Sequence, residues 1–368
     1  HKASENIYKI FCKAEENLSF NAPLMQLTVY SCILLISWLG AKMIVGSSLS
    51  TGELMSLLTY CMNILMSLMM LSMVFVMVTM SIASAERVTE VINDTADITD
   101  PEDPVTDVPD GSIVFDHVNF SYKKDSQESV LKDINISIRS GETIGIIGGT
   151  GSGKSTLVSL ISRFYDATSG TVKLNGRNVK DLTNQEIHDK VGIVQQRSVL
   201  FKGSIRDNMK WGNENASDSE IWDALKVAQA KEVVEGKDGQ LDFMLEQNGK
   251  NLSGGQRQRL TIARALVKKP EILILDDSLS ALDFATDAAL RKALAGLEGE
   301  TTTFLVSQRV AGIRQADKIL VLDNGELAGS GTHDELMKSC EVYREIYFSQ
   351  FPEERIKYEK TAGKEVLA

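Results

Sequence analysis

Two long charge-free segments near the N-terminal end constrain the fold of this chain most strongly. No charged residue or histidine occurs between Asn17 and Ala41, a run of 25 residues, or between Leu54 and Ala85, a run of 32. As a helix, the shorter run would extend roughly 38 Å, which exceeds the hydrocarbon core of a bilayer at about 30 Å. The two runs therefore favour membrane-spanning helices, at about residues 20–41 and 54–85, rather than buried core helices. The longer run should tilt or project beyond the core.

A cleavable signal peptide explains the first run poorly. The run begins far from the N-terminus, and the acidic pair Glu15 and Glu16 precedes it where a signal peptide has a basic region. The chain also begins with His1 rather than Met, so we expect it to be an excerpt of a longer protein.

Methionines recur every three or four residues in the second run, which places them along one side of a helix. The stripe consists of Met62, Met66, Met69, Met73, Met77 and Met80, beside a polar stripe of Ser56, Thr59, Asn63 and Ser67. Helix–helix packing in a membrane bundle is the more common use of such stripes. A soft, adaptable lining for varied apolar ligands is the functional alternative.

The net charge of the chain is concentrated outside these segments. Residues 1–90 hold five Lys and Arg against six Asp and Glu, whereas the rest hold 34 against 44, which accounts for most of the −11. An acidic balance argues against nucleic acid as a partner, because phosphates bind clustered Lys and Arg. The mean hydropathy of −0.08 is thus an average of unlike parts. The four cysteines form no C-x-x-C pair, which leaves no zinc or redox motif and fits a reducing compartment.

A polar segment separates the two parts of the chain. Residues 93–110 are rich in Asp and contain three of the six prolines, Pro101, Pro104 and Pro109, which is typical of a domain boundary. The sequence therefore predicts a partial transmembrane domain over residues 1–90, a linker over 91–110, a globular domain over 111–350 and a charged tail over 351–368.

The globular part alternates between strand-like and helix-like patterns. Apolar or alternating stretches predict strands at Ile113–Phe120, Ile134–Ile138, Thr143–Gly148, Val191–Val194, Ile272–Asp276, Thr302–Val306 and Ile319–Leu322. Helical patterns lie around Lys154–Arg163, Ser219–Ala230 and Ala285–Leu297. This order predicts an α/β domain with a largely parallel sheet flanked by helices and an antiparallel portion near its start.

A glycine-rich motif follows the expected strand at Thr143–Gly148. Residues 148–155 match G-x-x-x-x-G-K-[ST], the P-loop or Walker A pattern, and a helical pattern follows them. Glycines let backbone N–H groups surround phosphates, and the helix N-terminus adds its positive dipole end. Lys154 can reach the β- and γ-phosphates, and the Ser155 hydroxyl can ligate Mg²⁺. We expect nucleotide contacts from Gly148, Gly149, Thr150, Gly151, Ser152, Gly153, Lys154, Ser155 and Thr156.

A second strand end supplies a candidate metal ligand. The apolar strand that begins at Ile272 ends in Asp276 and Asp277. A carboxylate at the carboxyl end of a buried strand is well placed to hold hydrated Mg²⁺, whereas an isolated Asp there would more often be a turn residue. In a chain with a P-loop, the first of these carboxylates is the expected Mg²⁺ ligand.

A third motif carries a family resemblance. The segment Leu252-Ser253-Gly254-Gly255-Gln256, with Arg257-Gln258-Arg259 after it, resembles the LSGGQ motif of ABC transporter ATPases, and together with the P-loop it is highly specific. The resemblance covers nearly the whole chain, because residues 17–85 match the last two membrane spans of an ABC exporter half. It implies a C-terminal fragment that lacks four of six spans. Residues 111–350 would then be an ABC-type P-loop ATPase domain with a helical subdomain.

The resemblance also implies a partner. In this family two ATPase domains pack head to tail, and each ATP lies between the P-loop of one domain and the LSGGQ of the other. Ser253, Gly254, Gly255 and Gln256 would therefore contact the nucleotide of a second exporter half. Ser253, the glycine amides and a helix N-terminus offer donors for a γ-phosphate only across such an interface.

Three further positions match the family residue by residue. Tyr122 resembles the aromatic residue that stacks on adenine, although alone it would more often be an ordinary strand aromatic. Gln196 resembles the glutamine that touches Mg²⁺ and the γ-phosphate and couples the site to the membrane domain, and Gln195 is the competing choice. Asp283, in Ser280-Ala281-Leu282-Asp283, resembles the D-loop that crosses the dimer interface.

Two positions depart from the family pattern. Asp277 stands where the family has a Glu as general base, and its shorter side chain retracts the carboxylate by about 1.5 Å. A misplacement of that size can cost on the order of a hundredfold in rate. Gln308 stands where the family has a switch His, and Gln cannot carry the imidazolium charge.

Both departures affect the nucleotide at this chain's own P-loop, whereas the LSGGQ that serves the partner is intact. This distribution resembles the degenerate-site subunit of a heterodimeric multidrug-type ABC exporter, whose partner would supply the Glu and the His. A homodimer with two slow sites is the alternative.

The implied function is ATP-driven efflux of a drug, lipid or peptide, with ATP and Mg²⁺ as cofactors. The protein would be integral to a bacterial-type cell membrane, with its ATPase domain in the cytoplasm and the loop Lys42–Glu53 outside. A soluble ABC-type mechanoenzyme is a second possibility, which the charge-free runs disfavour. An uptake transporter is a third, although its ATPase is usually a separate polypeptide.

Overall fold

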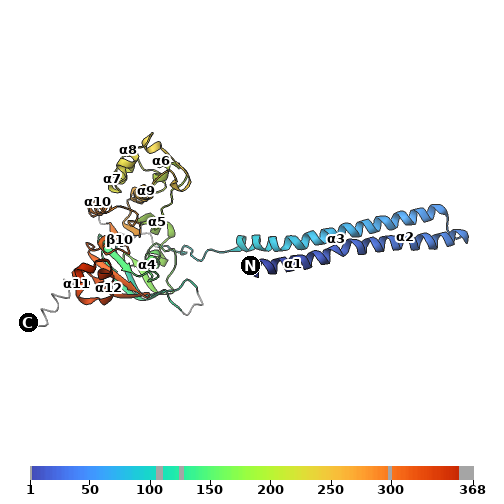
Figure 1. The fold of residues 1–368 in the computed structure, drawn as a ribbon, viewed down its shortest axis with the longest axis horizontal. Helices are drawn as coiled ribbons and strands as arrows, with labels where there is room; N and C mark the ends of the chain where they lie inside the picture. The colour runs from blue at the N-terminus through green and yellow to red at the C-terminus, as the bar shows by residue number, and fades with distance from the viewer. Residues whose placement is uncertain (1, 105–110, 124–127, 297–300, 356–368) are drawn as a thin grey trace, which may run out of the picture. The chain divides into compact units, whose positions relative to one another are not determined.

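The computed structural model describes residues 2–104, 111–123, 128–296 and 301–355 of the chain (Figure 1). The chain divides into two compact units, residues 1–96 and residues 97–368. The boundary falls inside the segment predicted as a linker, of which residues 105–110 lie outside the described part. Residues 356–368 of the predicted tail and Leu297 of a predicted helix also lie outside it.

Three helices make up the first unit: α1 (Lys2–Ser19), α2 (Asn21–Val45) and α3 (Thr51–Asn93). A capping box begins α3. The Ser50 hydroxyl accepts a hydrogen bond from the Glu53 amide at 3.2 Å, and the Glu53 carboxylate accepts one from the Ser50 amide at 2.8 Å. Both backbone donors are thereby satisfied, which fixes the start of the helix.

The helices α2 and α3 pack against each other. Gly40 of α2 lies so close to α3 that a Cβ atom on it would come within 2.3 Å of the Leu54 side chain. Small residues allow this kind of close approach between membrane helices. Both helices are long and apolar enough to cross a membrane. α3 contains the whole of the second charge-free run, and α2 contains the first run from Asn21 onward. At 43 residues, α3 would extend about 65 Å, roughly twice the hydrocarbon core.

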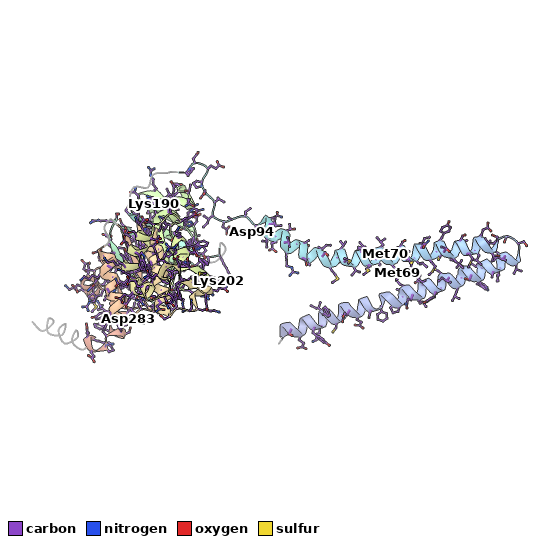
Figure 2. All side chains as sticks on the ribbon, turned by 90° about the horizontal axis from the view of Figure 1, so that it is seen from above. Met69, Met70, Asp94, Lys190, Lys202 and Asp283 are labelled. Atoms are coloured by element: carbon purple, nitrogen blue, oxygen red, sulfur yellow. The ribbon has the colours of Figure 1, made fainter. Side chains whose placement is uncertain are left out.

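Side chains of α3 lie at the surface of this unit. No residue of α3 is buried within the described part, and Met69 and Met70 are 50% and 73% exposed (Figure 2). Every methionine of the predicted stripe is exposed as well. An apolar surface of this extent is typical of contact with lipid or with further protein.

The second unit is built on a six-stranded sheet. Its strands are, in spatial order, β12 (Glu326–Gly331), β11 (Lys318–Asp323), β3 (Thr143–Gly148), β10 (Thr302–Val306), β9 (Ile272–Asp276) and β6 (Val191–Val194). All neighbours pair in parallel except β12, which is antiparallel to β11 at the edge. Ile144 and Ile146 of β3 belong to one core cluster, whereas Ile147 belongs to another. Both faces of the sheet are therefore covered, which explains the nearly continuous apolar strands.

A four-stranded antiparallel sheet packs into the same core as α4 (Lys154–Ile161). Its order is β2 (Leu131–Ile138), β1 (Ile113–Phe120), β4 (Ser169–Leu174) and β5 (Arg177–Asn178). The predicted α/β class, with a largely parallel sheet and an antiparallel portion near its start, is confirmed.

Most of the remaining helices lie in two regions (Figure 1). The remaining helices are α5 (Asn184–Lys190), α6 (Ile205–Lys210), α7 (Asp218–Val227), α8 (Lys231–Glu235), α9 (Gly254–Val267), α10 (Phe284–Ala295), α11 (His333–Ser339) and α12 (Glu341–Gln350). The first region gathers α6 to α9 into a helical subdomain, beside a short two-stranded antiparallel sheet of β7 (Gly203–Ser204) and β8 (Met244–Leu245). The second places α11 and α12 beside the parallel sheet, against β12, β11 and the short helix η4 (Val310–Gly312).

The first residues of the second unit are attached to it by polar contacts. The guanidinium of Arg163, almost completely buried, donates to the Thr99 carbonyl oxygen at 3.1 Å. The Asn184 amide, at the start of α5, donates to the Asp100 carboxylate at 2.7 Å. This part of the predicted linker therefore belongs to the folded second unit.

Five strand predictions are confirmed at both ends: Ile113–Phe120, Thr143–Gly148, Val191–Val194, Ile272–Asp276 and Thr302–Val306. The sequence did not predict β4 or β12. Both contain glycine and exposed polar residues, and β12 alternates between exposed and half-buried positions at an edge. Such strands lack the apolar run that a buried strand shows.

Candidate nucleotide site

Neighbouring parallel strands bring the predicted motifs together. The strands β3, β10 and β9 lie side by side and end at Gly148, Val306 and Asp276. The loops that follow therefore emerge at the same edge of the sheet, which is where open α/β sheets bind ligands. A cavity of about 340 Å³ lies at this edge.

Most of the predicted site residues line this cavity. They are Tyr122, Thr150, Gly151, Gly153, Lys154, Ser155, Thr156, Gln196, Asp276, Asp277 and Gln308. The described lining also includes three residues that the sequence reasoning missed: Val130, Val306 and Ser307. No motif marks Val130, because it precedes a strand and contributes only apolar surface. Val306 and Ser307 could have been inferred from their position between a strand end and Gln308.

The glycines of the P-loop are required by its backbone. Gly153, the residue before α4, has φ = 96°, in the left-handed region that side chains disfavour. A Cβ atom there would also lie 2.6 Å from the Leu131 side chain, and one on Gly148 would lie 2.1 Å from the Leu322 carbonyl oxygen. The loop can therefore keep this curvature only with glycine at these positions.

Lys154 lies under the loop with its charge directed at backbone oxygens. Its Nζ donates to the carbonyl oxygens of Gly148 and Gly149 at 2.9 and 2.6 Å, and approaches the Ser152 hydroxyl at 3.5 Å. Burial lowers the pKa of Lys154, and the carboxylates of Asp276 and Asp277 oppose that shift. A partly desolvated ammonium of this kind interacts strongly with an anion, because little water must be displaced.

Ser155 and Asp276 form a hydroxyl–carboxylate pair across the cavity. The Ser155 hydroxyl donates to Asp276 Oδ1 at 3.1 Å. Burial raises the pKa of Asp276, an effect that Asp277 adds to and that Ser155 and Lys154 oppose. A buried carboxylate beside a hydroxyl gains stability from a hard divalent cation, so the donor set fits Mg²⁺.

Gln196 and Asp277 also line the cavity and are hydrogen-bonded to each other. Gln196, two residues after β6, donates from Nε2 to Asp277 Oδ2 at 3.1 Å, whereas Gln195 does not line the described cavity. The Asp277 backbone has φ = 46° and donates to the Val306 carbonyl oxygen at 3.0 Å. Burial raises the pKa of Asp277, and the cations Lys154 and Arg309 oppose that shift. The motif search did not select Arg309, although its place beside Gln308 offered a signal.

Tyr122 stands at the mouth of the cavity beside the P-loop helix. Its hydroxyl and the Thr156 hydroxyl are hydrogen-bonded at 2.9 Å, and the residue is 55% exposed. Phe120 and Tyr165 contact that ring edge-on, with centroids at 4.9 and 5.1 Å. These contacts hold the ring in one orientation while leaving surface available to a planar base.

The loop that carries Gln308 is attached to the last helix. Gln350 of α12 donates to the Gln308 carbonyl oxygen at 2.8 Å and accepts from the Val310 amide at 2.9 Å. The side chain of Gln308 lines the cavity. Its placement therefore depends on a contact from a helix far along the sequence.

The LSGGQ segment lies at the start of α9, away from this cavity. Ser253 caps α9: its hydroxyl accepts from the Gln256 amide at 3.3 Å, and the Gln256 side chain accepts from the Ser253 amide at 3.1 Å. Neither these residues nor Gly254 and Gly255 line the described cavity. Asp283 likewise caps α10, accepting from the Thr286 amide at 2.9 Å. Within one chain, therefore, neither the LSGGQ segment nor Asp283 lines the P-loop cavity.

Known proteins are similar to this chain in sequence. A family model described as "ABC transporter" matches residues 131–280. An uncharacterized ABC transporter ATP-binding protein, YfiB, of Bacillus subtilis (strain 168) is 39% identical over 353 residues, covering 96% of this chain and 61% of that protein. A putative multidrug export ATP-binding/permease protein of Staphylococcus aureus (strain NCTC 8325 / PS 47) is 41% identical over 244 residues, covering 66% of this chain and 42% of that protein.

The fold of this chain is also similar to that of a solved structure. The structure of a bacterial Atm1-family ABC exporter with ATP bound matches with a TM-score of 0.77 and 32% identity, over 92% of this chain and 59% of that one. The chain thus spans about three fifths of the length of the B. subtilis relative and of the exporter structure. It carries two apolar helices followed by an ABC-type ATP-binding domain, and it belongs to the ABC transporter family.

Proposed function

We propose that this chain binds MgATP at its P-loop as the ATPase part of an ABC exporter half, and that its own site turns ATP over slowly. One observation carries the proposal. Asp277 and Gln308 line the same cavity as the P-loop, while the LSGGQ segment outside that cavity keeps the family pattern. The two departures from the family pattern would therefore affect the nucleotide at this chain's own P-loop and not the nucleotide of the partner.

The chain's own groups would bind and orient ATP. Lys154 and the P-loop amides would neutralise and position the phosphates, and Tyr122 would offer its face to the adenine. Ser155, Asp276 and Gln196 would hold Mg²⁺, which neutralises phosphate charge when bound. The raised pKa of Asp277 suits a proton acceptor, because a more basic carboxylate takes a proton from water more readily.

Two features limit the Asp277 carboxylate in that role. It is one methylene shorter than Glu, and Gln196 already donates a hydrogen bond to it at 3.1 Å. Gln308 can donate a hydrogen bond to a phosphate but cannot add a positive charge. We therefore expect tight nucleotide binding with slow hydrolysis at this site.

The site is completed by a second chain in this proposal. Ser253 is exposed at the start of α9, a 14-residue helix, with Gly254 open to solvent. This surface would contact the ATP of a partner that carries Glu and His at the two deviant positions. We therefore favour a heterodimeric exporter. The alternative is a homodimer whose two ATP sites are both slow. The acidic charge balance of the second unit argues against nucleic acid as a partner.

The two apolar helices support a membrane setting. α2 and α3 would span a bacterial-type cell membrane with the ATP-binding domain in the cytoplasm, and closure of paired domains would move the helices between inward- and outward-facing forms. Drugs, lipids and peptides all fit as cargo. The soluble mechanoenzyme is disfavoured, because apolar helices with this exposure are unstable in water.

The test compares ATP turnover by the chain in lipid nanodiscs with that of the double variant Asp277→Glu, Gln308→His. Wild type should bind MgATP and hydrolyse it slowly, and the double variant should gain on the order of a hundredfold. Adding Asp276→Asn to the double variant should abolish the gain, because a Mg²⁺ ligand is lost. Vigorous turnover by a wild-type homodimer would contradict the slow-site proposal, and failure to bind MgATP would contradict the whole assignment.

A further inference from the structure

A second, larger cavity lies beside α10 and the segment that follows η4. It has a volume of about 690 Å³ and is lined by α10, β10, the segment Ala311–Ala316 and Phe351. None of its described lining residues is shared with the nucleotide cavity. Cavities of this size are typical of small-molecule sites.

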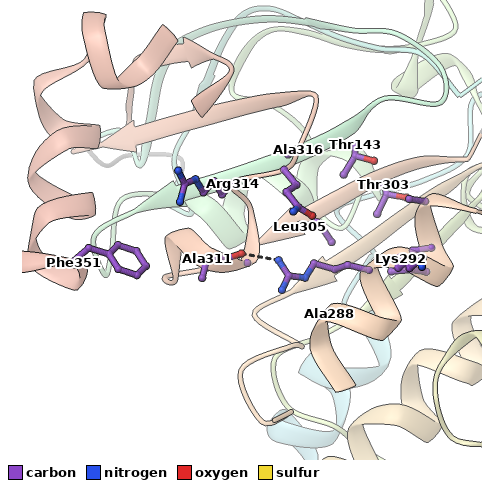
Figure 3. Close-up of a pocket in the computed structure, with 14 residues that line it drawn as sticks. Thr143, Ala288, Lys292, Thr303, Leu305, Ala311, Arg314, Ala316 and Phe351 are labelled. Atoms are coloured by element: carbon purple, nitrogen blue, oxygen red, sulfur yellow. Dashed lines mark hydrogen bonds between the residues drawn. The ribbon is translucent and has the colours of Figure 1, made fainter. Parts of the chain in front are cut away.

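The floor of this cavity is apolar and its rim is basic. Leu294, Leu305 and Ala316 are buried beneath it, at 6–8% exposure. Lys292 and Arg314 are exposed at the rim. Lys292 and Phe351 lie at opposite sides of the opening, so a ligand of moderate length can contact both (Figure 3). The described lining contains three cations and no carboxylate, in a unit that is acidic overall.

The three cations differ in how their charge is satisfied. Arg291 donates to the Ala311 carbonyl oxygen at 2.6 Å and to the Asp287 carboxylate at 2.9 Å, so it is largely neutralised (Figure 3). Arg314 lies over the Tyr347 ring at 5.9 Å and has no ion pair within the described residues. Lys292 has neither an ion pair nor a hydrogen bond to any described residue. Two positive charges at the rim are therefore available to an anion.

We propose that this cavity binds an amphipathic organic anion, with its apolar body on the Leu294–Leu305–Ala316 floor and its carboxylate or sulfonate at Lys292. Apolar burial would supply much of the affinity, and the Lys292 ammonium would select the charged end. This site is separate from the nucleotide site and does not depend on the proposed function. The cation contact defines the ligand class, because a neutral molecule of the same shape would forgo it.

The test measures ¹⁹F line broadening of 4-(trifluoromethyl)benzoate on the chain in lipid nanodiscs. The neutral analogue 4-(trifluoromethyl)benzyl alcohol should bind about tenfold more weakly, and Lys292→Glu should weaken benzoate binding by at least about tenfold. The matched control is Lys226→Glu, which reverses the charge of an exposed lysine in the last turn of α7, as Lys292→Glu does in the last turn of α10. This control should leave benzoate binding unchanged. Ala295→Trp, which fills the cavity from α10, should abolish binding.

Benzoate could also occupy the phosphate site, so Lys154→Ala serves as the second control. Binding that survives Lys154→Ala and is lost with Lys292→Glu supports the second cavity, whether or not the chain hydrolyses ATP. Absence of broadening, equal binding of the alcohol, equal loss with Lys226→Glu, or loss with Lys154→Ala would each overturn the proposal.

Discussion

At the scale of single residues, the nucleotide site contains charged groups that are partly desolvated. Lys154 and Asp276 are both partly buried, and burial is the main cause of the shift in the pKa of each. Groups of this kind lower the stability of the free protein and become favourable when a ligand arrives. The side chains that lower the stability of the free protein are therefore the same ones that would bind the ligand.

Asp276→Asn should stabilise the nucleotide-free chain at neutral pH. The pKa of Asp276 is raised in the folded state, so its ionised form costs folding free energy above that pKa, and the amide removes the cost. We expect a rise in Tm of roughly 2 °C. The difference should shrink as the pH falls through the raised pKa and vanish only well below the ordinary value of 3.8, where the carboxyl is protonated in both the folded and the unfolded state.

Thermal unfolding between pH 7.5 and pH 4.5 checks this expectation. Asp223→Asn, at an exposed position of α7, is the matched control and should change Tm little. MgATP should raise the Tm of wild type and leave that of Asp276→Asn unchanged, because binding to the folded state alone stabilises it. A lower Tm for Asp276→Asn at neutral pH would contradict the argument.

At the scale of elements, helix starts carry much of the chemistry. α4 begins at the P-loop, α9 at the LSGGQ and α10 at Asp283. Ser253 and Asp283 are N-caps, so their side chains satisfy backbone donors whatever other role they serve. A loss of activity on substituting Ser253 would therefore mix two effects unless the cap is preserved.

Ser253→Asp separates these effects. Ser253→Ala removes the hydroxyl that accepts from the Gln256 amide and should cost about 1 kcal/mol of stability, whereas Asp is as good a cap and should retain it. The Asp variant nevertheless places a negative charge where the partner's phosphate would bind, so it should fail in nucleotide-dependent pairing.

Chemical denaturation of the two variants measures the cap contribution. Ser217→Ala is the matched control, because Ser217 forms the same capping box with Glu220 at the start of α7. It should lose about as much stability as Ser253→Ala without affecting nucleotide contacts. If Ser253→Asp is destabilised as much as Ser253→Ala, capping is not the structural role of this residue.

At the scale of the whole molecule, the chain consists of two units with opposite solvent preferences. The first exposes long apolar helices, and the second is an acidic α/β domain with its own two core clusters. The second unit extends further toward the N-terminus than its motifs indicate, because Thr99 and Asp100 are bound by Arg163 and Asn184.

A chain limited to residues 97–368 should therefore be soluble without detergent and bind MgATP. Starting it at residue 111 should lower its stability by about 1–3 kcal/mol, because the buried Arg163 guanidinium loses the Thr99 carbonyl as an acceptor. Residues 101–368 form the control, which keeps the second half of the linker but not Thr99 and Asp100, and it should be as unstable as the shortest chain. Equal denaturation midpoints for all three chains would show that these contacts contribute nothing.

The sequence by itself determined the class of fold and the chemistry of the loops. Charge-free runs, buried parallel strands and the P-loop are local patterns, and each depends on residues that are close together in the chain. The strands with continuous apolar runs, such as Thr143–Gly148 and Ile272–Asp276, were accordingly predicted at their observed ends.

Only the tertiary structure decided which distant residues meet. Gln196 rather than Gln195 contacts Asp277, Tyr122 bonds to Thr156, and Gln350 holds the loop of Gln308. These contacts depend on strand order and helix packing, which no short motif encodes. The basic rim of the second cavity likewise combines Lys292 of α10 with Arg314 of the segment after η4. Its residues become a site only because the folded sheet brings them together.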